Sequence, residues 1–107
     1  MKTGNIEGID IIIGKNKLEN QELLLTMKDD DTWFHIYNFP SPHLKALGSY
    51  KDFSKKQIYL IALELKKNTK YKKTNNIKIM YTLRKNIILT EIPGMVNVEG
   101  GIKLISV

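Results

Sequence analysis

The stretch Asp31-Thr32-Trp33-Phe34-His35-Ile36 is the most informative part of the sequence, and it contains the single tryptophan of the chain. Successive side chains of a strand point to opposite faces of a sheet. A strand here therefore places Asp31, Trp33 and His35 in one row, with Phe34 and Ile36 on the other face. The second histidine, His43, follows just after the proline-marked turn Pro40-Ser41-Pro42. This cluster of an acid, an aromatic ring and two imidazoles is the first candidate for a site.

Short strands and two helices are predicted around this stretch. β-branched or alternating apolar residues predict strands at 9–13, 32–38, 43–47, 77–82, 87–89, 95–98 and 102–107. Asn16 with Glu19 three residues later resembles a helix N-cap, and predicts a short helix near 16–25. Ser54 with Gln57 is a better capping box, and opens a longer helix near 54–67.

The longer helix carries a wide apolar stripe, which predicts burial on most of its sides. The stripe consists of Ile58, Ile61, Ala62 and Leu65 at helical spacing, widened by Tyr59, Leu60 and Leu63. The elements together predict one α+β domain over residues 1–107, with a mixed or antiparallel sheet and two helices.

Charge is distributed unevenly along the chain. The net charge of +6 favours an anionic partner such as nucleic acid. Residues 1–53 carry 6 lysines and 8 acids, whereas residues 54–107 carry 11 lysines or arginines and 3 acids. The basic potential belongs to the second half and the Trp/His cluster to the first, so a joint site requires the fold to bring the halves together.

The lysine run after the longer helix has two interpretations. It is either a solvated helix end or a non-specific rail for phosphates. Tyr71, within the run, either stacks on a base or packs on the core. The lysines are Lys66, Lys67, Lys70, Lys72 and Lys73.

Composition limits the class of protein. The chain has no cysteine, which excludes disulfides and thiolate metal sites. No apolar run reaches the roughly 18 residues needed to span a membrane, and residues 1–5 lack the apolar stretch of a signal peptide. We expect a soluble, cytoplasmic protein with no cofactor and no membrane partner.

Each candidate residue has a structural and a functional interpretation. Trp33 is either a core aromatic or a stacking platform for an unpaired base, left exposed because Phe34 supplies the core from the other face. The two histidines either hydrogen-bond within the fold, contact nucleic acid, bind a metal with Asp31, or act in acid–base cleavage of RNA with Lys15 or Lys45 nearby. The spacing matches no zinc motif, and we expect neither a metal nor a catalytic site.

Basic residues near a turn give further candidates. Gly14-Lys15-Asn16 is either an ordinary turn and cap or a phosphate cradle at a helix N-terminus. It is not a P-loop, because the glycine-rich run and the Gly-Lys-Ser/Thr ending are missing. Arg84 and Lys85 follow a predicted strand and are candidates for phosphate contacts.

Several motifs in sequence order resemble those of the NFACT-R domain family. Gly14-Lys15-Asn16, Glu19-Asn20 and Leu23 resemble its opening pattern, and Asp31-Thr32-Trp33-Phe34-His35 resembles its Asp-x-Trp-Phe-His core. His43 resembles the histidine of its Pro-Gly-Ser-His turn. Ile79-Met80-Tyr81-Thr82 and Pro93-Gly94-Met95-Val96 resemble its Val-x-Tyr-Thr strand and Pro-Gly-x-Val turn.

The resemblance implies a stand-alone RNA-binding module without catalysis of its own. Domains of this family lie at the C-terminal end of NEMF-type ribosome-quality-control proteins and of bacterial relatives once called fibronectin-binding proteins. It implies tRNA or rRNA as ligand, with the ribosome or a quality-control protein as a further partner. The residues implied in nucleic-acid binding are Lys15, Asn16, Asn20, Asp31, Trp33, His35, His43, Arg84 and Lys85.

One departure from the family pattern concerns the histidine turn. Ser41-Pro42 replaces Gly-Ser, which removes easy access to positive φ and one backbone donor. If that turn holds a phosphate through N–H groups, we expect weaker binding here. Two interpretations stay open beside RNA binding: a protein-interaction module, and a small RNA-processing enzyme that uses His35 and His43.

Overall fold

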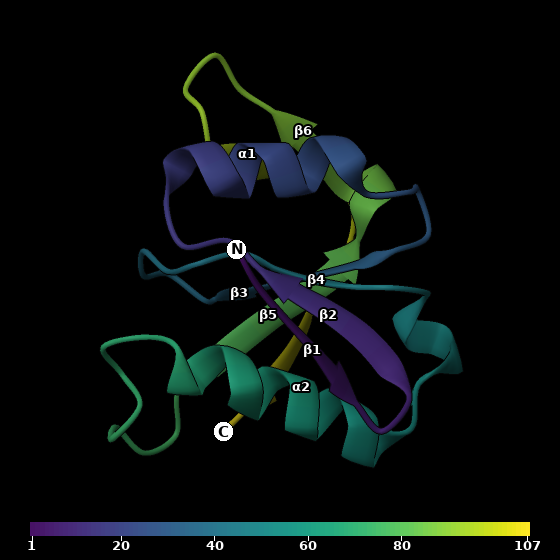
Figure 1. Ribbon diagram of the computed structural model, residues 1–107, viewed down its shortest axis with the longest axis vertical. Coiled ribbons are helices and arrows are strands. Elements are labelled where there is room, and N and C mark those ends of the chain that lie inside the picture. The colour runs from purple at the N-terminus through teal and green to yellow at the C-terminus, as the bar shows by residue number, and fades with distance from the viewer.

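The protein, described over residues 1–107 in a computed structural model, places a six-stranded sheet between two helices (Figure 1). Two short 3-10 turns, at Tyr50–Asp52 and Arg84–Asn86, lie in the connections between the main helices and strands. The elements are β1 (Lys2–Ile6), β2 (Ile9–Ile13), α1 (Lys17–Thr26), β3 (Thr32–Ile36), β4 (Leu44–Ala46), α2 (Lys55–Lys67), β5 (Lys78–Leu83), β6 (Ile87–Leu89), β7 (Val96–Val98) and β8 (Lys103–Ser106).

The sheet is antiparallel throughout. Its strand order is β1-β2-β4-β3-β5-β8, and every neighbouring pair runs in opposite directions. β6 and β7 form a separate antiparallel hairpin. The predicted α+β class with two helices is confirmed, and the sheet is of the antiparallel kind.

Both faces of the sheet are covered, as the alternation in β3 requires. Phe34 and Ile36 face the larger core with α2, whereas Trp33 faces a smaller core with α1 and the β6–β7 hairpin. Figure 1 shows α1 and β6 on one side of the sheet and α2 on the other. β3 is therefore a central strand with α1 and α2 on its two sides.

The helix starts follow the predicted caps. The Asn16 side chain accepts a hydrogen bond from the Glu19 N–H, and the Glu19 carboxylate accepts one from the Lys15 N–H, at 2.9 Å each. Ser54 and Gln57 form the full reciprocal capping box. Each cap satisfies N–H groups that the first helical turn leaves without a partner.

Three details differ from the predictions. β1 was not predicted, because Lys2-Thr3-Gly4-Asn5 offers no apolar alternation and its side chains lie exposed at a sheet edge. β3 ends at Ile36, two residues early, since the turn begins at Tyr37 and Asn38 within it has a φ of 65°. The prediction that α2 is buried on most sides is wrong, because Tyr59 is 45% exposed and only one stripe faces the sheet.

Neither helix has the length and apolar character that a membrane crossing needs.

Candidate nucleic-acid interface

The single tryptophan and the two histidines meet on the α1 side of the sheet. Trp33 and His35, two residues apart on β3, stack with ring centroids 5.4 Å apart and planes 15° from parallel. His43 lies just before β4 and stands edge-on to both rings, at 5.5 and 5.0 Å. Trp33 Nε1 donates a hydrogen bond of 3.1 Å to His43 Nδ1. The proline-marked turn thus brings His43 back beside the strand that carries Trp33 and His35.

Hydrogen bonds assign the proton on each imidazole. His43 Nδ1 accepts from Trp33, so the neutral ring carries its proton on Nε2. His35 Nδ1 lies 2.6 Å from the Ile36 carbonyl, which can only accept, so this nitrogen carries the proton and Nε2 keeps its lone pair. The two Nε2 atoms therefore differ: His43 offers a donor and His35 an acceptor.

Burial keeps both rings neutral. Desolvation, with a smaller effect from the neighbouring His35, lowers the pKa of His43 to about 3. Desolvation also lowers the pKa of His35, opposed in part by its hydrogen bond to Ile36. The pair at neutral pH is one donor and one acceptor without net charge.

Helix α1 holds the histidine turn in place. The Asn20 side chain accepts from the His43 N–H at 3.1 Å, and the Gly14 N–H donates to the His43 carbonyl at 3.0 Å. Gly14 allows this approach, because a Cβ there would lie only 3.0 Å from the Asn20 nitrogen and would overlap its side-chain oxygen. Asn20, which the sequence marked only through the family resemblance, thus positions His43.

These rings line a cavity of about 460 Å³, which we call the aromatic pocket. Its volume lies within the ~300–1,000 Å³ typical of small-molecule sites. Apolar side chains from β5 and the β6–β7 hairpin complete its walls. The lining residues are Lys17, Asn20, Trp33, His35, Pro40, Ser41, His43, Met80, Pro93, Gly94, Met95, Val96 and Val98.

A second cavity of about 400 Å³, the basic pocket, shares part of its rim with the aromatic pocket. Both are lined by Lys17, Asn20, Pro40 and Ser41. Apart from the two prolines, the basic pocket is lined by polar and cationic residues, and it adds Lys15, Asn16, Pro42, Asn68, Thr69 and Lys70 to the shared rim. The two pockets form one groove, which is aromatic at one end and cationic at the other.

Three exposed lysines give the basic pocket its charge. Lys15 and Lys17 come from the start of α1, and Lys70 follows the end of α2. None of the three takes part in an ion pair. The fold therefore joins a cation from the basic second half of the sequence to residues of the first half, as a joint site requires.

Three residues implied by the resemblance lie elsewhere and are held by the fold. Asp31 accepts hydrogen bonds from the Lys28 and Gly48 N–H groups, both at 2.9 Å. Arg84 donates to the carbonyls of Leu24 and Ile87, at 2.8 and 2.9 Å. Lys85 pairs with Asp30 at 3.5 Å. None of the three lines the groove, and the chain contains no group of three or more acids and histidines arranged to hold a metal.

Of the two interpretations of Trp33, the structure supports the core aromatic, because α1 and the hairpin cover its face of the sheet and its side chain is 0% exposed. The ring is therefore not an exposed stacking platform. The partly exposed ring is that of His35, stacked on Trp33. Lys17 was not predicted as a site residue, and Lys70 was considered only as part of the lysine run, because only the tertiary structure brings the two beside the histidine turn. Lys66, from the same run as Lys70, is buried and donates to the Val107 carbonyl.

The departure at Ser41-Pro42 has a structural consequence. The Ser41 hydroxyl accepts from the Ile36 N–H at 3.1 Å and donates to the Pro42 carbonyl at 2.9 Å. The His43 N–H is already donated to Asn20. The turn is thus closed by its own hydrogen bonds, and the free cations for a phosphate are the lysines of the basic pocket.

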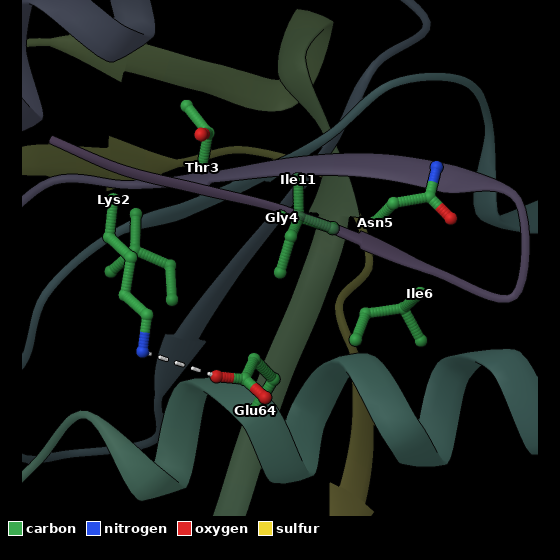
Figure 2. A pocket seen from close by; sticks show the side chains of 8 residues that line it. Lys2, Thr3, Gly4, Asn5, Ile6, Ile11 and Glu64 are labelled. Carbon is green, nitrogen blue, oxygen red and sulfur yellow. Dashed lines mark ion pairs between the residues drawn. The ribbon is translucent and has the colours of Figure 1, made fainter.

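A smaller pocket of about 170 Å³ lies on the α2 side of the sheet, between β1 and α2 (Figure 2). The ion pair of Lys2 with Glu64, at 3.6 Å, lies at its edge. It contains no aromatic or histidine side chain and no unpaired cation. The groove, and not this pocket, combines aromatic, imidazole and unpaired cationic side chains.

Comparison with known proteins supports the fold and a distant relationship. No family model matches the chain. Coiled-coil domain-containing protein 25 of Danio rerio is 33% identical in an alignment of 82 residues that covers 72% of this chain and 40% of that protein. The C-terminal structure of the fibronectin/fibrinogen-binding protein from Streptococcus suis superposes with a TM-score of 0.86 at 24% identity, over 99% of this chain and 44% of that one. The chain thus spans less than half the length of either protein, and the second likeness is one of fold.

Proposed function

We propose that the protein is an RNA-binding module of the NFACT-R type, and that its groove is the binding surface. The observation that carries the proposal is the shared rim between a pocket of aromatic and histidine side chains and a pocket with three unpaired lysines. Proteins that bind unpaired nucleotides combine these two features: bases lie against aromatic rings, and phosphates follow a basic channel.

The division of the groove supports this role. The partly exposed His35 ring stacks on buried Trp33, lies edge-on to His43 and is neutral at pH 7, which suits a base or ribose and disfavours a phosphate. Lys15, Lys17 and Lys70 suit phosphates, because each is exposed and none forms an ion pair. The motif resemblance supports tRNA or rRNA as the natural ligand.

The histidines support binding more than catalysis. A general acid must be protonated at the working pH, and the low pKa of His43 leaves its imidazolium almost unpopulated there. His43 also uses Nδ1 to accept from buried Trp33, and His35 uses its Nδ1 proton on Ile36. We therefore propose a module without catalysis of its own.

The direct test is binding of total tRNA over a salt series. The variant Lys15→Gln/Lys17→Gln/Lys70→Gln is expected to bind more weakly, and to reduce the slope of log K against log salt by about 2 to 3. The matched control is Lys51→Gln/Lys55→Gln/Lys103→Gln, which removes the same charge at exposed positions outside the groove. Equal loss in both variants would mean that net charge, and not the groove, binds RNA.

A protein partner is the second candidate, and exposed apolar side chains favour it. Leu18 and Leu25, seven residues apart on one face of α1, are 74% and 64% exposed. Association through these side chains would persist at high salt and after nuclease treatment. Loss of such an association in Leu18→Ser/Leu25→Ser, with tRNA binding unchanged, would identify this surface.

A further inference from the structure

The two histidines present complementary hydrogen-bonding atoms to the aromatic pocket. His43 Nε2 carries a proton and His35 Nε2 carries a lone pair, as their Nδ1 partners dictate. Neither Nε2 has a partner within the protein, and no unpaired side-chain nitrogen is sealed from solvent. Both residues line the pocket and their ring centroids lie 5.0 Å apart, so a ligand there meets one donor and one acceptor on neighbouring rings.

A charged group fits this pair poorly. The His35 lone pair would face an anion's own lone pairs, and the walls of Met80, Val96 and Val98 are apolar. The one cation that lines the pocket, Lys17, belongs to the rim shared with the basic pocket. A planar neutral group that carries a donor beside an acceptor satisfies both Nε2 atoms. The exposed edge of an unpaired nucleobase is such a group.

We infer that the aromatic pocket binds one unpaired base and tests whether its hydrogen-bonding edge is free. This inference rests on the proposed RNA-binding function and adds what the site recognises. Every base places a donor next to an acceptor on its edge, so the pair does not select one base over the others. It rejects a base whose edge is already paired or is blocked by a methyl group.

The rest of the groove fits this arrangement. Lys17, Asn20, Pro40 and Ser41 belong to both pockets, so a nucleotide whose base occupies the aromatic pocket extends its sugar and phosphate toward Lys15 and Lys70. Base and phosphate then occupy neighbouring sites of opposite character.

The test compares three RNA octamers at low salt: uridine, N3-methyluridine and 5-methyluridine. N3-methylation removes the donor that His35 Nε2 needs, whereas 5-methylation adds the same bulk away from that edge. The protein is expected to bind the N3-methyl octamer about tenfold more weakly, the factor set by one buried acceptor left without a partner. It is expected to bind the other two alike.

The variant His35→Phe keeps an aromatic ring against Trp33 and removes the acceptor. It is expected to bind the uridine and N3-methyluridine octamers equally, and thermal denaturation checks that it folds. Lys17→Gln is the matched control and is expected to weaken both octamers by the same factor.

Each other outcome counts against the inference in a distinct way. Equal binding of all three octamers by the unaltered protein overturns base-edge recognition and leaves RNA binding standing. If His35→Phe still binds the N3-methyluridine octamer more weakly than the uridine octamer, the size of the methyl group alone explains the difference, and base-edge recognition is again overturned. Failure to bind both the octamers and tRNA overturns the proposed function itself.

Discussion

Lowering the pH from 7.5 to 5.0 is expected to destabilise the fold by about 2 kcal/mol, because His43 is buried in its neutral form. Its side chain is 3% exposed, and its pKa falls from 6.5 to about 3. In the unfolded chain His43 therefore binds a proton near pH 6.5, whereas in the folded chain it binds one only near pH 3. Stability is complete above pH 6.5 and falls as the pH drops toward the folded pKa.

The magnitude follows from linkage. With those two pKa values, the unfolded state at pH 5.0 gains about 2 kcal/mol from protonation and the folded state gains almost nothing. His35 adds to the loss, since its pKa is also lowered. Glu19 adds nothing in this range, because its pKa is lowered from 4.5 and it titrates below pH 5.

Urea unfolding at the two pH values, followed by Trp33 fluorescence, measures the effect. Trp33 is the only tryptophan and is fully buried, so its emission reports global unfolding. His43→Gln is the control and is expected to show a smaller difference between the two pH values. An unaltered free energy of unfolding between pH 7.5 and 5.0 in the natural sequence would refute the assignment of a buried neutral His43.

Three substitutions test other parts of the account by thermal or urea denaturation. Gly14→Ala is expected to cost about 1–3 kcal/mol, because the new Cβ overlaps the Asn20 side chain. Arg84→Met is expected to lower the free energy of unfolding by roughly 2 kcal/mol, because its hydrogen bonds to two carbonyls are lost. The salt dependence of tRNA binding is expected to stay unchanged. A smaller salt dependence in this variant would identify Arg84 as a phosphate contact after all. Ser54→Ala removes the α2 cap and is expected to cost about 1 kcal/mol, and no change in stability would contradict the role of the cap.

Local patterns predicted most of the fold. Alternation in β3 gave the two faces of a central strand, and both helix caps formed at Asn16 and Ser54. β1 was missed because its edge position places no demand for apolar side chains on Lys2-Thr3-Gly4-Asn5. This segment can be recognised as a strand only from its pairing within the folded sheet.

The candidate site was predictable in part. His35 and His43 could be assigned to one site, because a strand and a proline turn fix their relation. The burial of Trp33 could not be predicted, since it depends on the β6–β7 hairpin, more than fifty residues further along the chain. Lys70 reaches the groove only through the placement of α2, which no local pattern reports.

The most direct test of the central claim is to map RNA contacts on the protein. Backbone amide NMR shifts would be followed as the uridine octamer is added to ¹⁵N-labelled protein. The account predicts the largest changes at residues 14–20, 41–43 and 68–70, with the ring signals of His35 and His43 shifting along with them. Changes confined to β1, β8 or the pocket of Figure 2 would contradict the assignment of the groove as the RNA-binding surface.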